Sequence, residues 1–287
     1  MTTAGSVMTE LETAQPSAQA GAAVTVTLID REPQAREVVQ VLAEIWPRAD
    51  GKEPLPAELA WVFAHSGNYV ALASVDGEAV GAAIGFRGDD ADGPHLHSHI
   101  AGVLPRWQGS NVGYTLKQHQ RAWALGHGLD RITWTFDPLV ARNAYFNVVK
   151  LGARLTRYYV DFYGPMDDGI NVGDETDRCL ATWSLVSDAA TAAAVGHFTA
   201  VDADAARSAG AVQSLTRDQE GRPVLLATDA PTRLLALPPD IVAVRRHQPA
   251  VAREWRLALR QALVAAFADG LEVVGVSRDS VYLLERP

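Results

Sequence analysis

Three histidines alternate along one predicted strand: His95, His97 and His99. Successive strand side chains point to opposite faces, so these three imidazoles are predicted to share one face of a sheet. An imidazole titrates near neutral pH, and His99 or His97 could therefore act as the general base that removes a proton from an attacking ammonium. His99 ranks first because it lies nearer the turn that follows the strand.

Two other readings of the histidines stay open. They could be partly buried residues with structural partners, or His97 and His99 could be ligands of a hydrolase metal, as in other His-x-His strands. The metal reading lacks a His-Glu-x-x-His motif and repeated strand–helix units. No metal is therefore expected.

The turn that follows this strand is a second candidate site. Residues 103–114 read VLPRWQGSNVGY, in which a strand ends, a glycine-bearing turn follows and a helix begins at Val112. Such a turn points backbone N–H groups outward at the positive end of a helix dipole, and glycine lets the backbone approach a bulky anion. The turn is therefore predicted to hold a pyrophosphate, with local charge added by Arg106, Arg142 or Lys117.

The elements that position these groups follow from the apolar pattern. Strands are predicted at 24–30, 69–75, 78–87, 95–104, 132–136, 155–163 and 179–186, and helices at 33–46, from residue 56, at 112–127 and at 143–150. Asp76-Gly77 favours a tight hairpin between the second and third strands. The order of elements is therefore β, αα, βββ, α, β, α, ββ.

The two ends of the chain differ from this pattern. Residues 1–22 lack apolar periodicity and are predicted to be a disordered tail. Residues 187–287 begin with an Ala-rich stretch, read as a linker or surface helix, and continue with a helix from Pro249 and short strands at 271–276 and 281–284. Two strands are too few for a sheet, so this extension is predicted to pack on, or to extend, the sheet of residues 23–186.

Composition limits the partners. The 287 residues include 25 Lys plus Arg and 34 Asp plus Glu, a net charge of −9, and 48% are hydrophobic. This balance argues against a nucleic-acid or membrane-surface binder. No run approaches the roughly 18 apolar residues that span a bilayer. A cytoplasmic location is expected, with the single cysteine, Cys179, as a small buried hydrophobe.

The order of elements and the turn resemble those of the GNAT acyltransferase superfamily. Its pattern here runs Val-x-Pro-x-x-Gln/Arg-x-x-Gly-x-Gly/Ala, which Val103, Pro105, Gln108 and Gly113 match, while Asn111 stands where glycine is usual. The resemblance covers residues 24–186 and implies an α+β fold, a mixed, mostly antiparallel sheet with helices on both faces. It also implies acyl-coenzyme A, carrying an acetyl or succinyl group, held by Val103, Gln108, Gly109, Ser110, Asn111, Val112, Gly113, Tyr114 and Asn143.

The family's coenzyme-A-side helix usually ends Tyr-x-Lys-x-Gly. Lys150 and Gly152 match this ending, but Val148 stands at the tyrosine that commonly protonates the leaving thiolate. Tyr145 is the expected substitute acid, although an aromatic packed in the core explains it equally well. The spacing of His97 and His99 from Gln108 also resembles the paired histidines of arylalkylamine N-acetyltransferases.

The last candidate lies in the acidic loop at residues 165–178. Asp177 could attract a cationic amine and Arg178 could clamp the acceptor's carboxylate in bidentate fashion, unless the loop is simply solvated. Thr176-Asp177-Arg178 and the extension look like a longer GNAT branch, some of whose members are associated with N-succinylation of amino acids. The resemblance thus implies an N-acyltransferase for a small amine or amino acid, and by analogy a homodimer. The alternative is a catalytically silent acyl-coenzyme A sensor.

Overall fold

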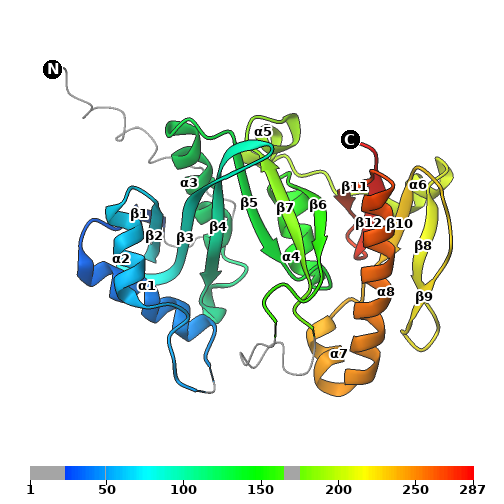
Figure 1. The fold of residues 1–287 in the computed structure, drawn as a ribbon, viewed down its shortest axis with the longest axis horizontal. Helices are drawn as coiled ribbons and strands as arrows, with labels where there is room; N and C mark the ends of the chain where they lie inside the picture. Colours follow the sequence, from blue (N-terminus) through cyan, green and yellow to red (C-terminus); the bar gives the residue numbers. More distant parts are fainter. Residues whose placement is uncertain (1–22, 49, 165–174) are drawn as a thin grey trace.

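The computed structural model describes residues 23–48, 50–164 and 175–287, and its strands form one twelve-stranded sheet (Figure 1). The strand order is β1-β2-β3-β4-β5-β7-β6-β11-β12-β10-β8-β9. Pairing is antiparallel except at β4–β5 and β10–β8. The first seven strands in sequence are β1 (Val24–Leu28), β2 (Tyr69–Val75), β3 (Glu78–Asp90), β4 (Gly93–Val103), β5 (Arg131–Phe136), β6 (Arg154–Tyr159) and β7 (Arg178–Ser184).

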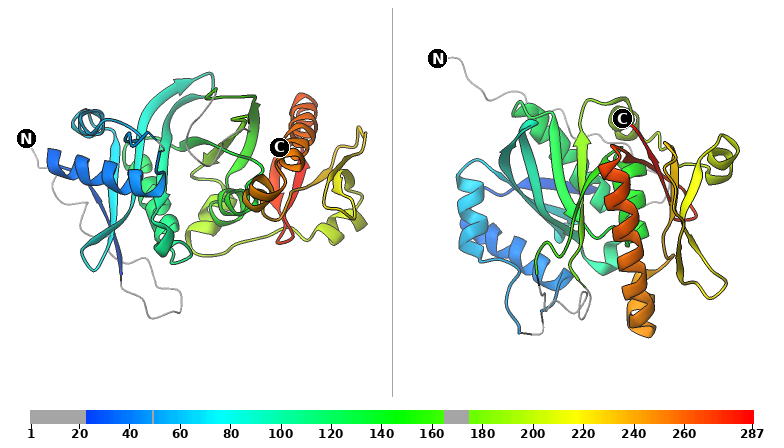
Figure 2. Two further views of the ribbon diagram at one scale, coloured as in Figure 1. Left: turned by 90° about the horizontal axis from the view of Figure 1, so that it is seen from below. Right: turned by 45° about the vertical axis from the view of Figure 1, so that its right-hand side comes forward.

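Helices cover both faces of this part of the sheet. α1 (Glu32–Ile45) and α2 (Ala57–His65) pack against β2 and β3 through Val38, Leu42 and Ile84. α3 (Val112–Gly126), α4 (Ala141–Tyr145) and the π-helical turn Phe146–Lys150 pack with the other face, where the larger core lies. Figure 2 shows α1 and α2 on one side of the sheet and α3 and α4 on the other. The predicted α+β class, a mixed and mostly antiparallel sheet with helices on both faces, is confirmed.

The C-terminal segment continues the same sheet. β11 (Glu272–Val276) pairs with β6 at Val273 and Leu155, and β12, β10, β8 and β9 follow outward. Its long helix α8 (Pro249–Ala268) lies on the same side of the sheet as α1 and α2 (Figure 2). The remaining elements are α5 (Asp188–Ala194), α6 (Ala203–Ser208), β8 (Val212–Arg217), β9 (Pro223–Leu225), β10 (Arg233–Ala236), α7 (Ile241–His247) and β12 (Val281–Glu285).

The structure confirms several of the sequence predictions and adds elements that were not predicted. Asp76 and Gly77 both have left-handed backbones, with φ of 49° and 82°, as a primed hairpin turn requires. Cys179 is fully buried. The final strands extend the sheet as expected, but β8, β9, β10 and α7 were not predicted. The predicted tail 1–22 and most of the acidic loop, residues 165–174, lie outside the described residues.

Among the residues that the structure describes, no helix is both long and apolar enough to cross a membrane.

Candidate active site

The parallel strands β4 and β5 form a split in the middle of the sheet. They pair only through Leu96–Ile132 and His97–Thr133, although β4 runs on to Val103 and β5 to Phe136. Beyond His97 the two strands diverge (Figure 1). The backbone edge of β4 along the split is therefore not paired with β5 and can form hydrogen bonds to an extended ligand.

A β-bulge lies at the closed end of the split. The register of β3 with β4 steps from Gly85–Ser98 to Ile84–Ile100, so His99 is the extra residue. His97 and His99 both lie beside Phe86, with ring centroids 5.3 and 6.0 Å away. The predicted shared face is therefore observed for these two histidines.

This histidine face is the α1–α2 side of the sheet. Phe86 stacks on Phe63 of α2, and the His97 Nδ1 atom and the Thr133 hydroxyl share a hydrogen bond of 3.1 Å. Tyr163, which follows β6, shares a hydrogen bond of 3.2 Å with Thr135 of β5. The two histidines, both threonines and Tyr163 thus belong to one connected group on the face of the sheet that carries α1 and α2.

The surroundings keep His97 neutral. Burial, together with the charges of His99, His95 and Lys117, lowers the pKa of His97 to about 4. Partial desolvation also lowers the pKa of His99, the more exposed of the two. Both imidazoles are therefore unprotonated at pH 7 and able to accept a proton.

The low pKa of His97 predicts a pH dependence of stability. Between the unfolded pKa near 6.5 and the folded value near 4, the unfolded chain binds more protons, so stability falls as pH drops through this range. The loss from His97 is at most about 2–3 kcal/mol. Urea unfolding at pH 7 and pH 4.5 should show a smaller acid loss for His97→Asn than for the wild type. The exposed His197→Asn should keep the full loss, and equal losses in all three proteins would contradict the prediction.

The predicted pyrophosphate turn leads from β4 into α3. Gly109 and Asn111 have left-handed backbones, with φ of 86° and 71°, so asparagine does adopt the conformation for which the family uses glycine. Asn111 is the N-cap residue of α3, but its side chain makes no capping hydrogen bond. The N–H groups of Val112, Gly113 and Tyr114 form the first turn of α3, where a helix has no internal acceptors for them.

The side chains of the turn hold its shape. Gln108 donates from Nε2 to the Val103 carbonyl at 3.3 Å, and the Ser110 hydroxyl donates to the Trp107 carbonyl. The Tyr114 hydroxyl donates to the Ala193 carbonyl at 2.5 Å. These side chains therefore brace the turn, and its backbone is the part that fits an anion.

Two of the cations expected to add charge to the turn are engaged elsewhere. Arg106 forms ion pairs with Glu44 at 2.6 Å and Glu78 at 2.5 Å. Lys117 is buried beneath the sheet, where it donates to Ser98. Arg142 is exposed at the start of α4, next to the exposed Asn143. The expectation for Arg106 and Lys117 is corrected: two carboxylates neutralise the Arg106 guanidinium, and Lys117 is buried away from the turn.

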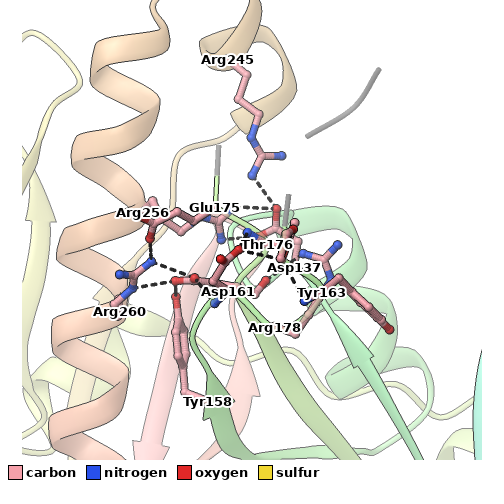
Figure 3. Close-up of polar contacts among 12 residues, drawn as sticks. Asp137, Tyr158, Asp161, Tyr163, Glu175, Thr176, Arg178, Arg245, Arg256 and Arg260 are labelled. Carbon is pink, nitrogen blue, oxygen red and sulfur yellow. Dashed lines mark hydrogen bonds and ion pairs between the residues drawn. The ribbon is translucent and has the colours of Figure 1, made fainter. Parts of the chain in front are cut away.

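Asp177, which directly precedes β7, belongs to a polar cluster with Tyr158 and Arg260, both labelled in Figure 3. It is fully buried, and its carboxylate accepts from Arg260 of α8 at 2.8 Å and from the Tyr158 hydroxyl at 2.5 Å. The Asp161 N–H donates to the same carboxylate at 3.0 Å. A carboxylate satisfied in this way is not presented to an incoming amine, so we assign Asp177 to the fold of this region.

Arg178 is the first residue of β7 and lies next to Asp177 of this cluster. Its Nη1 donates to the Asp177 carbonyl at 2.9 Å, and its guanidinium carbon is 5.3 Å from the Tyr163 ring centroid. The arginine is thus close to the group that contacts Thr135 on the histidine face. Its role as a carboxylate clamp stays a prediction.

Asp137 is a second anchor that sequence reasoning missed. It directly follows β5, and Arg256 of α8 donates to its two oxygens at 2.8 and 2.9 Å, while Arg245 of α7 donates at 2.5 Å. Although burial opposes ionisation, these guanidinium groups hold the pKa of Asp137 well below its usual range. The C-terminal helices are thereby fixed to the strand that borders the split.

Tyr145, the expected substitute acid, packs against the core of the domain. It ends α4 and is half-buried. Val148, at the position of the family's usual tyrosine, lies in the π-helical turn and is 6% exposed.

Among the described residues, no group of three His, Cys, Asp or Glu side chains is placed to hold a metal ion.

Part of the chain matches a known protein family. Residues 35–147 match the model of the acetyltransferase (GNAT) family. The sequence matches none of the curated proteins with which it was compared.

Solved structures of acetyltransferases are distantly similar to this chain. A GNAT acetyltransferase from Streptococcus pneumoniae is 17% identical, with 56% of this chain and 98% of that one covered and a TM-score of 0.46. YncA, a putative acetyltransferase from Salmonella typhimurium with its cofactor acetyl-CoA, is 18% identical, with coverage of 58% and 97% and a TM-score of 0.45. An IAA acetyltransferase from Bacillus cereus is 16% identical, with coverage of 57% and 100% and a TM-score of 0.43.

Proposed function

We propose that this chain, whose residues 35–147 match the acetyltransferase (GNAT) family model, is an N-acyltransferase that moves an acetyl or succinyl group from coenzyme A to a small amine or amino acid. The observation that carries the proposal is the split between β4 and β5, which has a bulge with two histidines at its closed end and an N-terminal helix turn of α3 beyond Val103. The acceptor attacks directly in a ternary complex.

The split and the turn fit an acyl-coenzyme A. The first-turn N–H groups of α3, from Val112, Gly113 and Tyr114, suit a pyrophosphate, and the diverging edge of β4 suits an extended amide chain. The bound thioester supplies the activated acyl group. Binding through backbone groups also reconciles a polyanionic substrate with a net charge of −9.

The acceptor would approach from the histidine face. His99, with His97 as its neighbour, removes the proton that an ammonium must lose before its nitrogen attacks. A backbone N–H at the bulge is the proposed donor to the oxyanion, because a bulge leaves a residue outside the regular strand pairing. Arg178 beside Tyr163 would hold the carboxylate if the acceptor is an amino acid. The cytoplasmic location and the homodimer stay predictions.

The turn can be tested through coenzyme A affinity. Gly113→Asp places a carboxylate in the first turn of α3, which suits the helix dipole but repels a pyrophosphate. We expect the Kd of acetyl-coenzyme A to rise at least about tenfold, or ~1.4 kcal/mol, by calorimetric titration. The control is Gly113→Ala, whose Cβ would lie at an ordinary 3.5 Å from Val103 Cγ2 and which should bind nearly as the wild type does. Equal affinities of the aspartate and alanine variants would count against the site.

Transfer itself separates the enzyme from a sensor. Val148, buried at the position of the family's usual tyrosine, favours a module that binds acyl-coenzyme A without turnover. Release of coenzyme A thiol should be followed with acetyl- and succinyl-coenzyme A against a panel of amines and amino acids. Amine-dependent release supports the acyltransferase, and tight binding without release across the panel supports the sensor.

A further inference from the structure

Lys117 is a buried lysine behind the split. It lies on α3, is 7% exposed, and donates from Nζ to the Ser98 hydroxyl at 2.8 Å and to Gln120 Oε1 at 3.0 Å. The same Nζ lies 4.1 Å from the Trp134 ring centroid. Charged lysines are rarely buried unless they are paired, and here the partners are a hydroxyl, an amide and an aromatic ring.

The partners of the Lys117 ammonium lie on the two strands that form the split. Ser98 on β4 and Trp134 on β5 are the residues immediately beyond the last strand pair, His97–Thr133. Lys117 therefore bridges the two strands where they begin to diverge, on the α3 side of the sheet. The two histidines lie at the same point of the split but on the α1–α2 side.

One side of the split thus carries proton acceptors, the two histidines, and the other carries a proton donor, Lys117. Acyl transfer needs a proton acceptor for the attacking amine and a proton donor for the departing thiolate. The neutral imidazoles supply the acceptor on one side. On the other side, burial lowers the pKa of Lys117 to about 7, so that its ammonium can release a proton near neutral pH.

We propose that Lys117 is the catalytic acid that protonates the coenzyme A sulfur, in the role the family usually gives to the tyrosine replaced here by Val148. This inference rests on the proposed function. As the amine nitrogen bonds to the acyl carbon, the carbon–sulfur bond breaks and its electron pair goes to sulfur. Sulfur takes a proton from the Lys117 ammonium, while a histidine takes the proton that the amine loses. The lysine regains a proton from solvent, so the sum is amine plus thioester giving amide plus thiol.

The main variant is Lys117→Met, which keeps an unbranched side chain only one atom shorter and removes the ammonium. We expect kcat to fall about 10²-fold or more, the usual effect of losing a general acid. The thermal midpoint at pH 7 should be no lower than in the wild type, because a lysine with a depressed pKa opposes folding at this pH. The control is Lys52→Met at an exposed lysine, which should keep both values.

A readout independent of turnover is the ionisation of bound coenzyme A. If the ammonium contacts sulfur, it stabilises the thiolate, so ultraviolet thiolate absorbance should appear at lower pH in the wild-type complex than in the Lys117→Met complex. The shift should be at least about one pH unit for an opposite charge at contact distance. A lysine that merely supports the bulge would leave the two titrations equal.

The leaving group gives the third test. An acyl thioester of an acidic aryl thiol needs little proton donation, so the loss of activity in Lys117→Met should shrink at least tenfold with this donor. Full turnover with acyl-coenzyme A in Lys117→Met, or coincident thiolate titrations, would overturn the role of Lys117 and leave the acyltransferase proposal intact. A wild type that binds acyl-coenzyme A but never transfers would overturn both.

Discussion

Replacing His97 and His99 together by alanine should lower kcat by about 10²–10⁴-fold, the range for loss of a general base. Both rings lie beside Phe86 at the closed end of the split, and the depressed pKa values keep them unprotonated at pH 7. The Kd of acyl-coenzyme A should change little, since the pyrophosphate turn is formed by other residues. Steady-state rates and calorimetric titrations measure the two effects.

The single variants His97→Ala and His99→Ala show how much each histidine contributes as the general base. His99→Ala should account for most of the loss, because His99 is the bulge residue and the more exposed ring. His97, which shares a hydrogen bond with Thr133, should contribute less. His197→Ala, at an exposed position, controls for general effects of removing an imidazole. Unchanged turnover in the double variant would remove both histidines from the reaction.

The second large effect concerns stability. Asp137→Asn should lower the free energy of unfolding by about 3–5 kcal/mol, because it removes the buried carboxylate to which Arg256, 1% exposed, donates two hydrogen bonds. Urea unfolding at pH 7 measures the change. The same variant should loosen α8 and α7, since Arg245 also pairs with Asp137.

A matched control is available on the same helix. Glu254 of α8 pairs with Arg222 at 2.7 Å, but both side chains are more than 40% exposed. Glu254→Gln should therefore change stability by no more than about 0.5 kcal/mol. Comparable losses for Asp137→Asn and Glu254→Gln would show that burial of the Asp137 cluster does not matter for the docking of the extension.

Local sequence signals predicted most of residues 24–186. Strands and helices there have strong apolar periods, and the Asp76-Gly77 hairpin and the left-handed Asn111 have side-chain or backbone preferences that act within a few residues. The match of the turn to a family pattern supplied the ligand, which the bare glycine spacing would not have identified.

The features that could not be predicted depend on contacts between residues that are far apart in the sequence. β9 has three residues and β10 four, and such short runs become strands only by pairing with neighbours far along the chain. Asp137 meets Arg256 119 residues later, and no local pattern marks either as a partner. Lys117 was expected to add charge at the pyrophosphate turn, but it is buried and contacts Ser98 and Trp134 instead.

A crystal structure of the protein with an unreactive acyl-coenzyme A analogue tests the site most directly. It should show the pyrophosphate on the N–H groups of Val112, Gly113 and Tyr114, and the pantetheine arm between β4 and β5. The sulfur should lie within hydrogen-bond distance of Lys117, and the acyl carbon should face His99. A ligand bound outside the β4–β5 split would contradict the acyltransferase mechanism proposed for this chain.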